Sequence, residues 1–278
     1  MKTIFIQCLL LITLAAAGQK KADSRFIEHL LNQGAYREVT FLLDSSRTSY
    51  NDSLHHFKGQ AHYHLKELVL STEALLKVSR QSDFYLKSRF FAGSNCIFNN
   101  KYERATSIFS EIDAKEGSVR TLRNFELNGI NVLNGHYALA AKNWQSIDSS
   151  LSVIYEPLSS LKNITLELEQ HRAKSPVVAG LLSALVPGSG KIYAGKTGQG
   201  IAAFIATAGL GLISWENYNK LGATHIKTLA FGSAFAASYV SNIYGSVMTA
   251  KIVENEYQQV MHQQVLFHLH IPLRNYFR

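Results

Sequence analysis

The residues best suited to chemistry lie in one glycine-rich stretch, PGSGKIYAGKTGQG, at positions 187–200. Within it, Gly190–Thr197 (GKIYAGKT) satisfies the pattern GxxxxGK(S/T) of a phosphate-binding loop. In such a loop backbone N–H groups wrap the phosphate, while Lys196 would reach it and Thr197 would hold Mg²⁺. The loop also needs a strand before it and an acidic residue from a parallel sheet to complete the metal site. Because no Asp follows Lys196, nucleotide binding is the alternative hypothesis rather than the favoured one.

Four histidines form a second group of titratable residues: His55, His56, His62 and His64. His55 and His62 are seven residues apart and can share one face of a helix. No carboxylate stands at a spacing that would complete a metal site with them. We therefore expect a solvated or groove-lining role for these side chains, and we assign the chain no catalytic residue, no metal ligand and no cofactor.

The glycine-rich stretch fits the entry to a membrane hairpin better than it fits a phosphate loop. A proline can end a short apolar helix, glycines allow a tight turn and close helix approach, and a tyrosine can sit at headgroup level. The pattern PGxGxxYxGxxxxG followed by two apolar helices resembles a small two-transmembrane-helix domain of many bacterial membrane proteins. The matching residues are Pro187, Gly188, Gly190, Tyr193, Gly195 and Gly200, within about 175–253. That family has no agreed enzymatic activity, so the resemblance implies a membrane location and little more.

The apolar segments around this stretch have lengths that suit a membrane. Val177–Val186 is too short to cross a bilayer core, which needs about 20 helical residues, so we expect it at the interface or part-way in. Gly198–Trp215 and Thr228–Ala250 carry no charge and are long enough to span. Small residues recur at four-residue spacing in both spans, and we expect these faces to pack together: Ala203, Thr207 and Gly211; Ser233, Ala237, Ser241 and Gly245. For Asn242 we expect an interhelical hydrogen bond.

The N-terminal 18 residues have the pattern of a secretory signal peptide. Lys2 precedes an apolar core, and the small residues Ala15–Gly18 provide a cleavage site. After cleavage only Cys96 remains, among Phe and Ile residues, which favours a buried structural thiol. The formal net charge of +8 comes without a long Lys/Arg run, and no nucleic-acid-binding motif is present.

From Asp23 to Asp148 the sequence repeats with a period of 32 to 35 residues. Each unit carries an aromatic residue or Leu, a small or β-branched residue three positions on, and a large apolar residue four further on, on one helix face. The best-matched positions are Tyr36, Gly59, Gly93, Tyr102, Ala105, Phe109, Tyr137, Ala140 and Trp144. Turns are expected at Gly34, Asn100 and Gly135. The period and the signatures GAYREVTFLL, NKYERATSIF and GHYALAAKNW resemble the tetratricopeptide repeat, whereas Gly129 stands one place late.

These patterns predict an all-α chain, in which a short tetratricopeptide-like helix-pair solenoid is followed by a transmembrane helical hairpin. The predicted segments are a signal peptide at 1–18, tetratricopeptide-like helical repeats at 19–148, a connecting helix at 149–174, a membrane hairpin domain at 175–253, and a C-terminal amphipathic helix and tail at 254–278.

Stacked helix pairs leave a concave groove suited to peptides or partner helices. The favoured hypothesis is therefore a non-enzymatic, membrane-anchored scaffold at the bacterial cell envelope, with its repeats on the periplasmic side. The expected partners are a protein or peptide in the repeat groove and the lipid bilayer. Neither a nucleic acid nor a small-molecule substrate is expected. The alternative remains a nucleotide-binding protein that uses residues 190–197.

Overall fold

The computed structural model describes residues 23–45, 51–114 and 117–278, so the predicted signal peptide lies outside the described residues. The chain divides into two compact units. Unit 1 comprises the residues up to Leu166 together with Val265–Arg278, and unit 2 comprises Glu167–Gln264.

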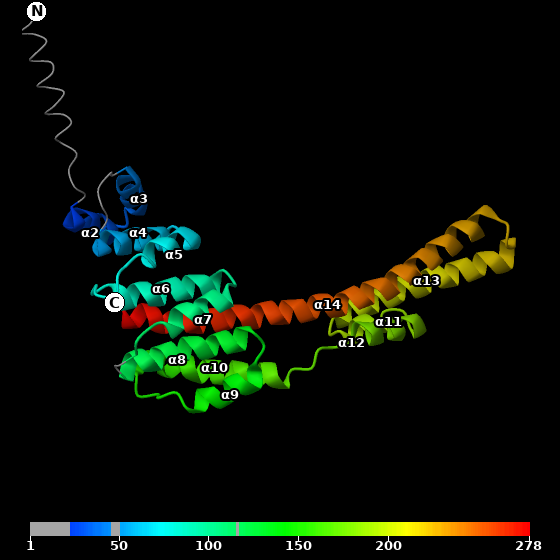
Figure 1. Ribbon diagram of the computed structural model, residues 1–278. Coiled ribbons are helices and arrows are strands. Elements are labelled where there is room, and N and C mark those ends of the chain that lie inside the picture. Colours follow the sequence, from blue (N-terminus) through cyan, green and yellow to red (C-terminus); the bar gives the residue numbers. More distant parts are fainter. Residues whose placement is uncertain (1–22, 46–50, 115–116) are drawn as a thin grey trace, which may run out of the picture. The chain divides into compact units, whose positions relative to one another are not determined.

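In chain order the first helices are α2 (Ser24–Asn32), α3 (Tyr36–Ser45), α4 (Asp52–His64), α5 (Leu68–Leu75), α6 (Tyr85–Phe98), α7 (Tyr102–Ser110), α8 (Gly117–Leu133), α9 (Tyr137–Gln145) and α10 (Ser152–Gln170) (Figure 1). The remaining helices are α11 (Pro176–Leu185), α12 (Ser189–Tyr193), α13 (Thr197–Leu221) and α14 (Ile226–Tyr276). The last part of α14 belongs to unit 1, and the rest of this helix belongs to unit 2.

The helices of unit 1 from α2 to α9 form pairs joined by the same kind of turn. Gly34, Asn100 and Gly135, the three expected turn positions, all have positive φ, and so does Lys66 at the corresponding place after α4. In each turn the next amide donates to a carbonyl five residues back, as Lys101 does to Cys96 at 2.8 Å. This bond closes the helix end and reverses the chain. Lys66 adopts a conformation that only glycine enters without strain, which is why its sequence gives no turn signal.

The second helix of each pair buries one repeating set of side chains. Each of these residues has an exposure of 0%: Val39, Leu43, Ser71, Leu75, Ala105, Phe109, Ala140 and Trp144. Glycines on the first helices make room for the largest of them. A Cβ at Gly59 would lie 2.5 Å from the Leu75 side chain, and one at Gly93 would lie 2.5 Å from the Phe109 ring. The spacing read from the sequence thus corresponds to packing positions between paired helices.

Unit 1 has a core of large side chains. The indole of Trp144 lies 5.5 Å from the Phe125 ring and donates to Thr165 Oγ1 on α10 at 2.9 Å. Cys96 on α6 is also buried, with 2% exposure, and burial raises the pKa of its thiol. An inert structural thiol was expected at this place, and its burial agrees with that expectation.

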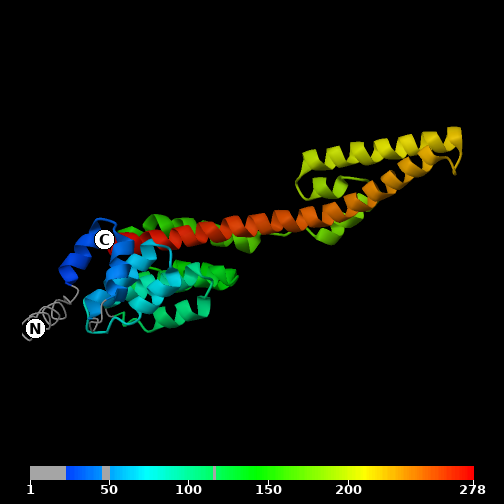
Figure 2. The same ribbon diagram turned by 90° about the horizontal axis from the view of Figure 1, so that it is seen from above.

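Unit 2 packs through small residues instead. Its buried apolar cluster consists of Ala179, Ala194 and Ala250, with Tyr193 partly buried against it. Hydroxyl groups join its helices: Ser183 Oγ lies 2.7 Å from Ser246 Oγ, and Thr207 Oγ1 lies 3.0 Å from Ser238 Oγ. Figures 1 and 2 both show α13 alongside the first part of α14.

Two expectations for unit 2 were wrong in detail. The small-residue ladder of α14 does not face α13, because Ser233, Ala237 and Ser241 are exposed. Instead, α14 contacts α13 through the neighbouring face, where Phe235 packs against Gly211. Asn242 is buried, yet neither atom of its amide has a hydrogen-bond partner, so the expected interhelical bond is absent.

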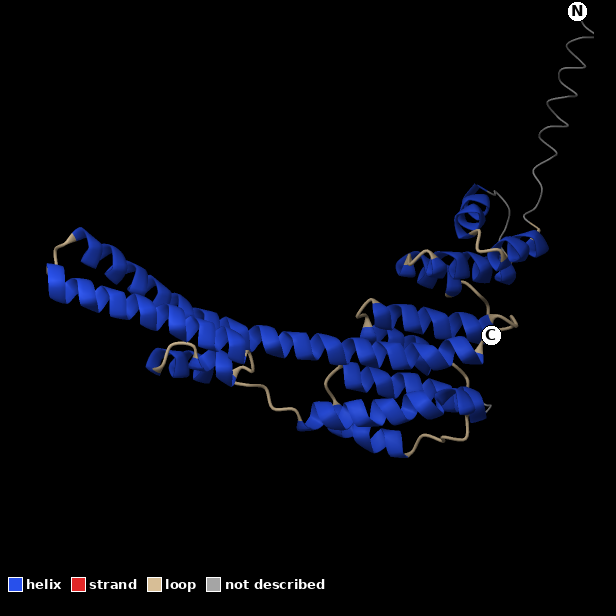
Figure 3. Ribbon diagram, turned by 180° about the vertical axis from the view of Figure 1, so that it is seen from behind, coloured by secondary structure: helices blue, strands red, loops and turns tan. Residues whose placement is uncertain are grey.

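Of the helices in the described ranges, only α13 is long and apolar enough by composition to cross a membrane. The second expected span forms the start of α14, and α11 is a short apolar helix. All regular structure in the described residues is helical, without a strand (Figure 3). The prediction of an all-α chain is therefore confirmed for this part of the protein.

Candidate functional site

The last part of α14, Val265–Tyr276, together with Phe277, packs into unit 1 and is called the C-terminal segment below. Its apolar residues lie at three- and four-residue spacing, which makes one helix face apolar. Leu266, Leu269 and Leu273 on this face are 5%, 3% and 0% exposed, respectively. The opposite side is open, and Phe267 is 61% exposed. The segment therefore binds unit 1 as an amphipathic helix.

The surface that receives the segment comes from the first helices of three successive pairs, α4, α6 and α8, and is called the inner face below. Aromatic side chains of α4 and α6 supply much of it. The Phe277 ring lies 5.4 Å from Phe90 and 6.5 Å from Phe91, measured between ring centroids. On α8, the hydroxyl of Ser118 lies 2.9 Å from that of Tyr276. Residues distant in sequence thus form one binding surface for a helix.

Gly129 on α8 gives the closest approach. A Cβ at this position would lie 2.2 Å from Leu269 Cδ2 and 2.8 Å from Leu269 Cγ, so a side chain here would force the Leu269 side chain to move. The glycine stands one place later than the glycines of the earlier helix pairs because it faces the C-terminal segment. Asn128 occupies the preceding place and donates to the Ala140 carbonyl at 3.0 Å.

His270 is the polar centre of the contact. Its Nε2 lies 2.6 Å from the Tyr63 hydroxyl, and its ring packs edge-on against Phe98 with centroids 5.4 Å apart. Burial, with the nearby charges of Arg274 and Lys66, lowers the pKa of His270 to about 4. The imidazole is therefore neutral at pH 7. Its Nδ1 is buried without a hydrogen-bond partner.

Glu126 is a second buried polar group on α8, one turn before Gly129 and on the same side of the helix. It is 1% exposed, and its Oε1 has no hydrogen-bond partner. Burial raises its pKa to about 8, so the carboxyl is mostly protonated at neutral pH. A neutral buried acid without a charged neighbour is not arranged as a metal ligand or as a carboxylate nucleophile.

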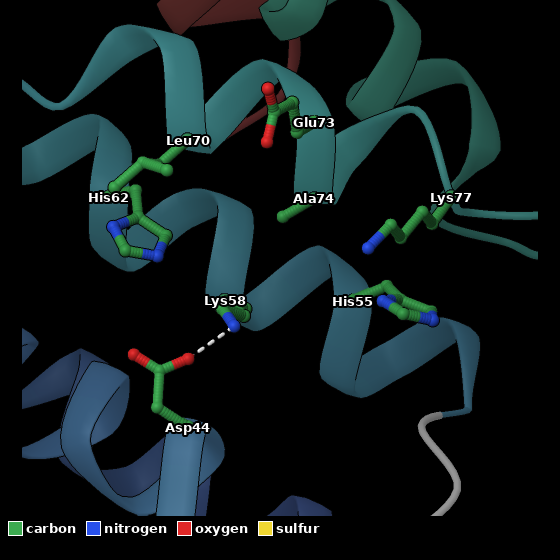
Figure 4. Close-up of a pocket in the computed structure, with 8 residues that line it drawn as sticks. All are labelled: Asp44, His55, Lys58, His62, Leu70, Glu73, Ala74 and Lys77. Carbon is green, nitrogen blue, oxygen red and sulfur yellow. Dashed lines mark hydrogen bonds and ion pairs between the residues drawn. The ribbon is translucent and has the colours of Figure 1, made fainter.

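A separate pocket of about 200 Å³ lies between α3, α4 and α5 (Figure 4). Its lining residues are Asp44, His55, Lys58, His62, Leu70, Glu73, Ala74 and Lys77. His55 and His62 do share one face of α4, as their spacing suggested. Lys58 forms an ion pair with Asp44, drawn as a dashed line, and His62 Nδ1 lies 2.6 Å from Glu67 Oε2.

The chemistry of this pocket is limited. Burial, together with the ammonium groups of Lys77 and Lys58, lowers the pKa of His55 and keeps its imidazole neutral. No Ser, Thr or Cys lines the pocket, so it offers no hydroxyl or thiol nucleophile. Within the described residues, no three His, Cys, Asp or Glu side chains come together as a metal site. We assign this pocket no reaction.

The glycine-rich stretch does not form an open loop. Residues 189–193 form α12, and the amides of this helix and of the turn after it are bonded within the protein. Ile192 donates to the Gly188 carbonyl at 3.2 Å, Gly195 to Ile192 at 2.9 Å, and Lys196 to Lys191 at 2.9 Å. Gly195 has a φ of +91° and ends α12 with the same turn that joins the helix pairs of unit 1.

Two glycines of the stretch allow backbone segments of neighbouring elements to lie in direct contact. A Cβ at Gly190 would lie 1.9 Å from the Ala179 carbonyl oxygen, and one at Gly188 would lie 2.0 Å from that of Gly200. Gly190 therefore allows α12 to pack against α11, and Gly188 allows the turn before α12 to pack against α13. Pro187 follows the end of α11.

Two polar side chains of the stretch, those of Tyr193 and Lys196, have partners within unit 2. The hydroxyl of Tyr193 accepts a hydrogen bond from the Ser175 amide at 3.3 Å, where α11 begins. Lys196 Nζ donates to Glu256 Oε2 at 3.3 Å rather than pointing into a phosphate cradle.

Sequence reasoning missed the binding of the C-terminal segment to the inner face. An amphipathic helix and tail were predicted at 254–278, but not the surface that covers its apolar face, although the spacing of Leu266, Leu269 and Leu273 indicates such a face. No protein-family model matches the sequence, and neither does any curated protein or any solved structure.

Proposed function

We propose that the chain is a non-enzymatic, membrane-anchored scaffold that binds a protein or peptide partner at a bacterial envelope membrane. In this proposal unit 1 is a tetratricopeptide-like solenoid, and α11–α14 carry a membrane hairpin domain. A signal peptide at 1–18 would place unit 1 on the periplasmic side.

One observation carries the membrane part of the proposal: the polarity of α11 is inverted relative to that of a helix on a water-soluble protein. Its inner side consists of small residues, with Ala179 and Ser183 buried. Its outer side is formed by large apolar residues, among them Leu181 at 62% and Leu185 at 80% exposure. In water this arrangement would leave apolar surface unburied, whereas in lipid it is favourable because small faces allow helices to approach.

The burial of α13 supports the same proposal. Only 11% of its most apolar stretch is buried, whereas the core helix of a water-soluble protein would be mostly covered. Trp215 and Tyr218, near the far end of the helix, are exposed and suit the headgroup level.

Binding of a partner is supported by the inner face of unit 1, which accepts an amphipathic helix through apolar contacts and two side-chain hydrogen bonds. This is a common mode of peptide recognition. Nucleotide binding through residues 190–197 is disfavoured, because the amides of α12 and of the turn after it are used within the helix.

Alkaline carbonate washing of membranes tests the anchor. We expect the wild type to remain in the pellet. Aspartates at Ile205 and Leu212 of α13, which are 64% and 71% exposed, should release the protein, since each charge costs about 2.5–3.5 kcal/mol inside a bilayer. The matched control places aspartates at Phe41 and Tyr155 of unit 1, 70% and 61% exposed, and should stay in the pellet. Release of the wild type would overturn the proposal.

A further inference from the structure

We propose that the inner face of unit 1 is a binding site for a partner's amphipathic helix, and that the C-terminal segment is an exchangeable internal ligand that competes for this site. This inference rests on the proposed scaffold function and names the class of partner. The partner would present bulky apolar side chains at three- and four-residue spacing, followed by an aromatic residue one or two turns later.

The contacts of the present occupant define this pattern. Leu269 fits over Gly129, where no larger residue could stand opposite it. Leu273 follows one turn later and is fully buried. Phe277 then reaches Phe90 and Phe91. Anchors repeated along one side of a helix are how a helical ligand is recognised by a complementary surface.

The present occupant leaves buried polar groups unsatisfied, which favours its exchange for another helix. His270 Nδ1 is buried without a partner at the contact, and Glu126 Oε1 is likewise unpartnered beside Gly129. Each such atom has lost its hydrogen bonds to water and gained none. Pro272 lies inside the helix and cannot donate to the His268 carbonyl, which removes one helical hydrogen bond. The segment is thus a suboptimal ligand, and a helix without these defects would bind more favourably.

Charge adds a second defect. Lys66 of unit 1 and Arg274 of the segment itself both act on His270. Lys66 Nζ lies 5.9 Å from the centroid of the Tyr63 ring, whose hydroxyl contacts His270, so two like charges lie close to this contact. A ligand with an uncharged or acidic residue in place of Arg274 would avoid their repulsion. The inner face therefore favours an uncharged or acidic residue at a position where the C-terminal segment carries Arg274.

The test uses the full-length protein in detergent and a fluorescent peptide of residues 263–278 as the probe. In the wild type the internal segment competes, so we expect weak binding. Leu269→Ser with Leu273→Ser weakens the internal ligand and should tighten peptide binding at least tenfold. Phe267→Ser is the matched control, because Phe267 points away from unit 1, and it should leave the affinity unchanged. Adding Gly129→Leu to the double variant should abolish binding.

A disulfide lock provides a second measurement, in which the segment is held in place instead of being weakened. The distance from a Cβ at Gly129 to Leu269 Cγ places the two Cβ atoms within roughly 4.5 Å, which suits a disulfide. Gly129→Cys with Leu269→Cys is probed with the peptide carrying Leu269→Ala, which leaves room for the side chain introduced at position 129. This variant should bind that peptide at least tenfold more weakly when oxidised than when reduced.

Two results would overturn the inference: equal peptide affinity of the oxidised and reduced forms, or no binding by a double serine variant that keeps the wild-type circular dichroism. Either would mean that the segment is a permanent part of the core. Loss of the membrane anchor in the carbonate assay would leave these results unchanged, so the two proposals fail separately.

Discussion

The two units of this chain bury opposite kinds of side chain. Unit 1 encloses Trp144, Phe90 and Phe109 with essentially no exposure, as a protein in water must do to gain stability from apolar burial. Unit 2 encloses Ala179, Ala194 and Ala250 and turns its large apolar residues outward. This difference is the one expected if unit 2 lies in lipid, as proposed, and unit 1 lies in water. In the proposed location lipid would not drive apolar side chains together, and close backbone approach and hydroxyl contacts would hold unit 2.

The largest effect is expected from the core of unit 1. Trp144→Ala removes a fully buried indole and its hydrogen bond to Thr165, and should lower the free energy of unfolding of unit 1 by about 3–5 kcal/mol. Urea unfolding followed by circular dichroism measures this change. Trp215→Ala removes an indole that is 65% exposed in unit 2 and should leave the unfolding of unit 1 unchanged. Similar losses in both variants would contradict the comparison.

A pH-dependent effect on the order of a few kcal/mol is expected from Glu126. Its pKa is about 8 in the folded protein, against an ordinary value of 4.5, so between these values the folded state holds a proton that the unfolded state has released. The free energy of unfolding should therefore fall as the pH rises from about 5 to 8. Glu126→Gln should remove this part of the pH dependence, as measured by urea unfolding at several pH values. Parallel profiles for the wild type and the variant would refute the assignment.

In unit 2 the most informative substitution adds only one methyl group. Gly190→Ala adds one methyl group 1.9 Å from the Ala179 carbonyl oxygen and should cost about 1–3 kcal/mol or more, because α12 must move away from α11. Gly198→Ala, in the same stretch, meets nothing within 4 Å and should be neutral or slightly stabilising. Fluorescence-detected gel filtration after heating compares the two. Equal tolerance of both alanines would mean that close packing does not hold unit 2.

The smallest effect is expected at Lys196. Its ion pair with Glu256 is exposed, so Lys196→Ala should change stability or lipid attraction by at most about 1 kcal/mol. We also expect no measurable ATP binding by the wild type in detergent, as titration with a fluorescent ATP analogue would show. Micromolar affinity that disappears in Lys196→Ala would instead support the nucleotide-binding alternative.

Much of unit 1 could be read from the sequence because its signals are local. The recurring aromatic, small and large apolar positions report which face of each second helix is buried, and Gly34 and Gly135 mark turns that need positive φ. The turn at Lys66 was not predictable in this way, because lysine has no preference for that conformation. Its place follows only from the neighbouring repeats.

The candidate site could not be read from the sequence because it depends on a long-range contact. Gly129 departs from the repeat pattern, and nothing near it in the sequence explains why. The reason is Leu269, far along the chain. In unit 2, likewise, composition indicated small-residue packing, but a shift of one residue around α14 decided which small residues face α13. Helical periodicity does not fix that rotation when residues on several sides are small.

The contrast between the two units can be measured most directly with nitroxide spin labels in lipid nanodiscs. Single cysteines at Leu181 and Ile205 of unit 2, and at Phe41 of unit 1, are introduced in a Cys96→Ser background. We expect the two unit 2 labels to be relaxed strongly by oxygen, which concentrates in lipid, and hardly at all by a water-soluble nickel complex. The Phe41 label should show the reverse. Equal access of the nickel complex to all three positions would contradict the proposal that unit 2 faces lipid.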